Sequence, residues 1–121
     1  MQESTWAGIV DSRQRAGNAL VLPFVIVHST VLVVLAFGGD ALGDSSVQLA
    51  VAAGAIIASL WCVMQWDGVF VDWAALIQDA PEGVASGAYG RGIAKAPIGM
   101  LRVIGPVFTG VLVVVELLAI Y

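Results

Sequence analysis

Charge is scarce in this sequence. Charged residues make up 12% of its 121 positions, about half the usual share in a soluble domain, while hydrophobic residues make up 60%. Small domains have the largest surface for their volume, so this little charge does not cover a soluble domain of this size. The composition therefore excludes a soluble globular enzyme and a disordered chain. The length predicts a single domain, residues 1–121.

Cysteine and basic residues are also few. Cys62 is the only cysteine, which excludes an intrachain disulfide, and its apolar neighbours predict a buried, unreactive thiol. Five basic and nine acidic residues give a net charge of −4. Because a negative chain repels a phosphate backbone, we expect no nucleic-acid partner. The sequence contains no nucleophile–base set, phosphate-binding glycine loop or metal-spaced cluster, so we expect neither an enzyme nor a metal site.

Three long apolar runs dominate what is present. The three runs cover about residues 19–37, 47–66 and 100–121. Nineteen residues at about 1.5 Å each reach roughly 28 Å, close to the ~30 Å hydrocarbon core of a bilayer. A short acidic turn at 38–46 predicts that the first two runs form an antiparallel hairpin, and Ser45 with Gln48 fits a capping box. The sequence therefore predicts an all-α integral membrane fold with three transmembrane helices in a lipid bilayer.

The segment after the second run has a different pattern. Residues 67–80 carry apolar side chains at spacings of three and four, which predicts an interfacial amphipathic helix, either separate or continuing the second span. Pro81 ends it. Residues 83–96 are rich in small residues, and both a loop and a short packed helix fit them. The expected interfacial anchors are the aromatic residues Trp61, Trp66, Trp73 and Tyr121.

The basic residues predict the orientation in the membrane. All five precede the first span or lie between the second and third: Arg13, Arg15, Arg91, Lys95 and Arg102. Because cytoplasmic loops carry an excess of Arg and Lys, we expect the N-terminus inside and the C-terminus outside, in a cell or virion membrane.

Small residues recur every four positions in the second span. They are Ala50, Gly54, Ala58 and Cys62. Between helices in lipid, small residues permit close backbone approach, which is the basis of association there. The sequence leaves two uses of this helix-packing stripe open: packing against the first or third span, and contact with another subunit.

His28, the only histidine, lies near the middle of the first span. Ionisable groups at this depth are costly and often functional. Three roles remain open: a hydrogen-bonded neutral imidazole, an axial haem or pigment ligand, and part of a proton relay or metal site. A b-type haem usually needs two histidines, so a haem would be shared with a partner chain, and otherwise we expect no cofactor. In size, span count and its single intramembrane histidine, the chain is similar to membrane anchors of quinone-linked dehydrogenases, which implies a redox anchor role for His28.

Glu116 is the only acidic residue in the third span. It lies roughly 7–8 Å inside the outer interface by helical rise. Three states are open for Glu116: a side chain that snorkels to the interface, a protonated carboxyl bonded to Gln48 at a similar depth, and a carboxylate in an ion or proton path. Counting from the span ends puts His28 about 6 Å deeper than Glu116, so a direct His28–Glu116 pair is possible but not expected.

Four function classes remain. Our leading hypothesis is a non-enzymatic structural or accessory membrane protein that assembles through small-residue helix faces, with itself or with other subunits, in a bioenergetic complex or a virus particle. The second is a haem- or quinone-associated anchor subunit that uses His28. The third is an oligomeric ion or proton conductor with Glu116 and His28 in its path. The fourth is a holin-like pore, ranked last because many holins end in a basic tail and this sequence ends in Leu-Leu-Ala-Ile-Tyr.

Overall fold

The computed structural model describes residues 2–121 and confirms the all-helical fold. Helices make up 89% of the structure, and the described residues contain no strand. Three helical stretches are long and apolar enough to cross a membrane: Glu3–Phe37, Ser45–Gln78 and Ile98–Ile120. Each contains one of the three apolar runs that the sequence predicts as spans.

The first stretch consists of two helices in nearly direct continuation. α1 spans Glu3–Ala19 and α2 spans Val21–Phe37, with Leu20 between them. Pro23 lies in the first turn of α2, where its missing N–H interrupts little of the helical hydrogen bonding. The polar segment before the first span is thus helical over most of its length, which the sequence did not predict.

A short 3₁₀ helix, η1 (Gly39–Gly43), reverses the chain after α2. Gly39 has a φ of +49°, a left-handed conformation that glycine adopts without strain. The next helix, α3, is capped by Asp44, whose carboxylate accepts hydrogen bonds from the hydroxyl and the backbone amide of Ser46. These bonds lower the pKa of Asp44 below its usual value. The predicted capping box of Ser45 and Gln48 is therefore wrong: Asp44 takes the cap position one residue earlier.

α3 spans Ser45–Gln78, 34 residues without a break. At about 1.5 Å per residue it is about 51 Å long, well beyond the ~30 Å of a hydrocarbon core. Residues 67–78 continue this helix and do not form a separate one. The part of α3 beyond Trp66 packs against α1. Both segments therefore lie beyond the ends of the apolar runs.

Two short helices connect α3 to the last long one. α4 (Glu82–Ala85) and α5 (Ala88–Ala94) cover most of the small-residue segment, and α6 spans Ile98–Ile120. Gly90 of α5 lies so close to the Val84 carbonyl of α4 that a side chain there would clash, which explains a glycine at this position.

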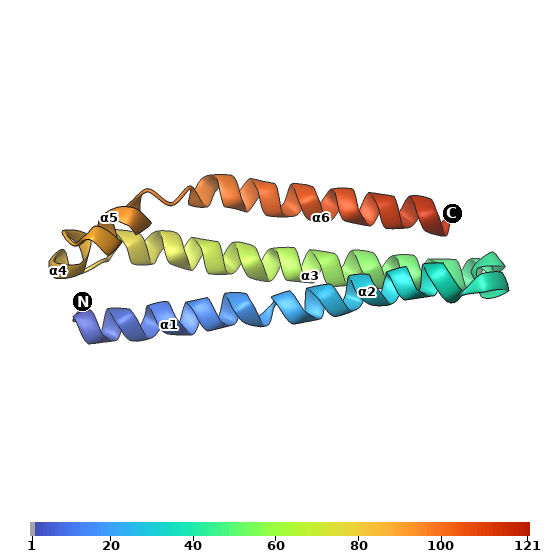
Figure 1. The fold of residues 1–121 in the computed structure, drawn as a ribbon, viewed down its shortest axis with the longest axis horizontal. Coiled ribbons are helices and arrows are strands. Elements are labelled where there is room, and N and C mark those ends of the chain that lie inside the picture. Colours follow the sequence, from blue (N-terminus) through green and yellow to red (C-terminus); the bar gives the residue numbers. More distant parts are fainter. Residues whose placement is uncertain (1) are drawn as a thin grey trace.

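α3 is the central helix of the molecule, and it packs against α1, α2 and α6 (Figure 1). The outer faces of α2, α3 and α6 are apolar; among their exposed side chains are Phe37, Leu60, Phe108 and Leu118. At the opposite end from η1, Trp6, Val10 and Leu76 form a small core between α1 and α3. Apolar side chains are thus largely on the outside of the bundle, which fits a lipid environment and not water.

Candidate functional site

The largest concentration of buried polar groups lies where α2, α3 and α6 meet. His28 Nδ1 of α2 is 2.8 Å from Glu116 Oε1 of α6, and His28 Nε2 is 3.2 Å from the hydroxyl of Ser59 on α3. One imidazole therefore links all three long apolar helices. We call His28, Glu116 and Ser59 the polar triad.

The polar triad is sealed from the surroundings of the bundle. His28, Ser59 and Glu116 have exposed fractions of 5%, 4% and 1%. The ring of Phe24, one turn before His28, packs on the imidazole with ring centroids 4.4 Å apart. Glu116 Oε2 is buried and has no hydrogen-bond partner. A charged group at this site loses its hydration and gains few hydrogen bonds in return. A net charge on the His28–Glu116 pair would therefore destabilise the bundle.

Local sequence explains how each side chain reaches this point. Ser59 lies on the same face of α3 as three other buried small residues: Ala52, Ala55 and Cys62. Spacings of three, four and three keep a set of side chains on one helix face. Because these side chains are small, α2 and α6 approach α3 closely enough for a histidine and a glutamate to meet beside Ser59. Sequence reasoning did not single out Ser59, although it is a polar residue on this line.

The expectation that His28 and Glu116 do not meet is wrong. It assumed that the helices are level at their ends, so that depth follows from counting residues. Figure 1 shows that α6 ends short of the η1 turn, while α2 continues into it. This offset moves Glu116 inward relative to α2, and the long glutamate side chain covers the remaining distance.

Gln48 does not bond to Glu116. Its side-chain amide donates to the backbone carbonyl of Ile120, at 3.0 Å. That carbonyl belongs to the last turn of α6, where helical carbonyls lack partners within the helix. Gln48 therefore ties the end of α6 to the start of α3 and leaves Glu116 to His28.

The contacts of His28 bear on the haem alternative. An axial ligand binds iron through a ring nitrogen with a free lone pair. Both ring nitrogens of His28 already face a partner, Glu116 on one side and Ser59 on the other. Ligation would require the ring to leave one of these contacts and the iron to enter a packed helix junction. The residues present do not fit a haem at His28.

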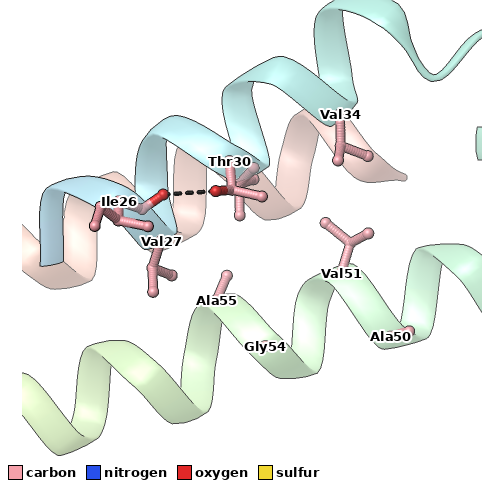
Figure 2. Close-up of a pocket in the computed structure, with 9 residues that line it drawn as sticks. Ile26, Val27, Thr30, Val34, Ala50, Val51, Gly54 and Ala55 are labelled. Carbon is pink, nitrogen blue, oxygen red and sulfur yellow. Dashed lines mark hydrogen bonds between the residues drawn. The ribbon is translucent and has the colours of Figure 1, made fainter. Parts of the chain in front are cut away.

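The small-residue stripe is divided between the inside and the outside of the bundle. Cys62 is buried and Ala58 is half-buried, whereas Ala50 and Gly54 are exposed. Ala50 and Gly54 line an open groove of about 280 Å³ between α2 and α3, together with Ile26, Thr30 and Val34. Figure 2 shows this groove, with the side chains of α2 above the bare backbone of α3 at Gly54. Added to Gly54, a Cβ would meet nothing within 4 Å.

The expected aromatic anchors differ in their surroundings. Trp61 and Tyr121 are exposed, with 61% and 71% of their surface accessible. Trp66 is half-buried and its indole donates to the carbonyl of Gly17 on α1, at 3.2 Å. Trp73 packs against the small core formed by Trp6, Val10 and Leu76. Trp66 and Trp73 thus hold α1 to α3 within the chain.

Two ion pairs mark the level where the apolar faces end. Arg102 of α6 donates to both carboxylate oxygens of Asp67 on α3, at 2.6 and 3.0 Å, and Arg13 of α1 is 3.2 Å from Asp72. All four side chains are about half exposed, so solvent screens both ion pairs and each adds little to the stability of the fold. The pairs instead indicate where a hydrocarbon layer would end along the bundle, because exposed charged side chains lie at or beyond its edge.

Comparison with known proteins adds no function to this geometry. No protein-family model, no curated protein and no solved structure matches the sequence.

Proposed function

We propose that this protein is a small structural or accessory membrane protein that assembles laterally with other transmembrane helices through the groove between α2 and α3. The support is one observation: the small residues Ala50 and Gly54 are not used inside the chain. The chain packs its own helices on the neighbouring face of α3, along Ala52, Ala55, Ser59 and Cys62. The backbone of α3 at Ala50 and Gly54 is therefore exposed on the outer surface of the bundle.

The groove suits a helix more than it suits water. Its lining is almost wholly apolar, and the one hydroxyl in it, on Thr30, is already bonded to the Ile26 carbonyl at 2.7 Å. In lipid, a helix that enters a small-residue groove gains packing contacts that acyl chains make less well. A second copy of this chain and a different membrane subunit are both suitable occupants.

Replacing Gly54 by Leu tests this proposal. Nothing within the chain lies within 4 Å of an added Cβ, so the fold should persist while the groove is filled. Overpacking a helix contact costs about 1–3 kcal/mol. We therefore expect association to weaken roughly fivefold to a hundredfold. The measurement is the size of the assembly in native membranes extracted with mild detergent and in lipid nanodiscs.

Gly110→Leu is the matched control. Gly110 lines a different groove, between α3 and α6, and an added Cβ there also meets nothing within 4 Å. We expect this variant to assemble like the wild type. An assembly whose size is unchanged by Gly54→Leu, or a wild-type chain that is monomeric in its native membrane, would refute lateral assembly through the α2–α3 groove.

We further propose that η1 faces the outside and that α1, α4 and α5 lie on the inside. The five basic residues gather at the end of the bundle opposite η1, whereas η1 and its cap carry Asp40 and Asp44. In this arrangement residues 67–78 of α3 rise out of the bilayer beside α1 and form an interfacial extension of the second span. The α2–α3 pair then acts as the antiparallel hairpin within the membrane.

Conduction of ions or protons ranks below lateral assembly. The polar triad brings together the two residues that a conductor would need, His28 and Glu116. A path also needs polar groups that lead away from the polar triad, and the only buried polar side chain outside the triad among the described residues is Thr109.

A further inference from the structure

Lateral assembly through the α2–α3 groove makes no use of the polar triad, so this site needs an explanation of its own. Three helices each give one buried polar side chain to it, and His28 Nδ1 lies 2.8 Å from Glu116 Oε1. Ionisable side chains inside a membrane bundle are costly, and they often belong to a functional site.

The number of protons on the pair fixes its net charge. With one proton, His28 and Glu116 are together neutral, whichever of the two carries it. With no proton the site has a net charge of −1, and with two protons a net charge of +1. Because an uncompensated charge is strongly unfavourable in a dry helix junction, the one-proton state is the stable one.

The contacts indicate where this proton lies. Glu116 Oε2 is fully buried and unpartnered. On an ionised carboxylate this atom would hold part of a negative charge without any donor. On a carboxylic acid whose proton is on Oε1, Oε2 is an ordinary neutral carbonyl oxygen, which is far less costly to leave unpaired. Oε1–H then donates to His28 Nδ1, and His28 Nε2–H donates to the Ser59 hydroxyl oxygen, so each ring nitrogen has a suitable role.

We propose that Glu116 and His28 form a binding site for one exchangeable proton, held on Glu116 Oε1 and donated to His28 Nδ1. When the proton leaves to water, Glu116 becomes a carboxylate, His28 stays neutral and the site gains a charge of −1. Glu116 is four residues from the end of α6, about 6 Å along the helix axis, so the η1 end is the near side for exchange.

No other strongly ionising group faces this site from the packed helices. α2 contains His28 alone, and α3 contains none from Ser45 to Trp66 except the Cys62 thiol. α6 contains Arg102 besides Glu116, 14 residues and about 21 Å away along the axis. His28 and Glu116 are therefore the two groups that share a proton at this site, and a change at one should be accompanied by a change at the other.

The test uses the fact that the chain has one histidine, so that ¹⁵N-histidine labelling reports on His28 alone. The full chain is reconstituted in phosphatidylcholine vesicles and titrated from about pH 5 to pH 10, a range that spans ordinary Glu, His and Lys titration. Infrared spectroscopy records the carboxylic acid C=O band, and NMR records the two ring nitrogens. We expect an acid band at neutral pH with His28 in its neutral Nε2–H form, and one proton released per chain as the band and the ¹⁵N signals change together.

Glu116→Gln keeps the side-chain shape and should abolish the acid band, the released proton and the linked ¹⁵N change. Glu3→Gln and Glu82→Gln alter the two other glutamates, which are exposed, and should leave all three signals intact. The proposal is overturned by a Glu116 carboxylate at every pH, by an acid band that does not exchange in D₂O, or by proton release on addition of Na⁺ at constant pH, which would make the site a cation site. None of these outcomes depends on assembly, which the Gly54→Leu measurement decides.

Discussion

Replacing His28 by Leu is expected to lower the unfolding free energy by about 1–3 kcal/mol, the usual cost of leaving a buried polar group without its hydrogen-bond partner. The substitution leaves Glu116 in the helix junction with neither carboxyl oxygen hydrogen-bonded, and Glu116 is 1% exposed. No nearby basic group is placed to replace the imidazole. The measurement is reversible unfolding in mixed detergent micelles, followed by the loss of helical circular dichroism.

The double variant His28→Leu/Glu116→Leu is the informative control. Replacing both partners of a buried pair by apolar residues of similar size is often neutral, since no polar group is then left unpaired. We expect its stability to lie within about 1 kcal/mol of the wild type, whereas Ser59→Ala alone should cost about 1 kcal/mol for one lost hydrogen bond. A double variant as unstable as His28→Leu would show that the pair is not what makes the single change costly.

Replacing Trp6 by Ala is expected to release α1 from α3. Trp6 is 5% exposed, packs against Val10 and Leu76, and its indole donates to the Leu76 carbonyl at 2.9 Å. Removing a buried tryptophan costs about 3–5 kcal/mol. Most of this loss falls on α1, because α1 has few other buried side chains. If detaching α1 from α3 costs 3 kcal/mol less, the population of the detached state rises more than a hundredfold.

Trypsin reports this opening directly, because Arg13 and Arg15 are both on α1. We expect cleavage after these residues to accelerate about a hundredfold in Trp6→Ala nanodiscs. Trp61→Ala is the matched control, since Trp61 is exposed on α3 and touches no core. Equal cleavage rates in the two variants would contradict the role that we assign to Trp6.

The fold was predictable from the sequence where hydropathy determines it. A run of about 20 apolar residues has few alternatives to a membrane-spanning helix, because its backbone polar groups must be satisfied within the segment. The extension of α3 to Gln78 and the helix α1 were harder to predict. Both depend on tertiary contacts, such as Trp6 with Leu76 and Trp66 with Gly17, between residues far apart in the sequence.

Two residues of the polar triad, His28 and Glu116, were predictable from the sequence, but Ser59 and the geometry of the triad were not. The position of His28 and Glu116 inside apolar runs suggested a functional role for both. Their contact, however, depends on the axial offset of α6 relative to α2, which cannot be predicted from any local sequence pattern. The small-residue stripe shows a related limit. Residues four apart turn by about 40° per step, so Ala50 and Cys62 differ by about 120° around a straight helix. They lie on different faces for this reason, whereas Ala52, Ala55, Ser59 and Cys62 stay on one.

Cysteine labelling from the two sides of the membrane tests most directly whether α3, the central helix, crosses it. In a Cys62→Ala background, Asp40→Cys places a thiol in η1 and Lys95→Cys places one directly after α5, both at exposed positions. In sealed right-side-out vesicles, a membrane-impermeant maleimide should label Asp40→Cys at once and Lys95→Cys only after permeabilisation. Equal labelling of both thiols from one side would contradict the membrane-spanning arrangement on which the whole account depends.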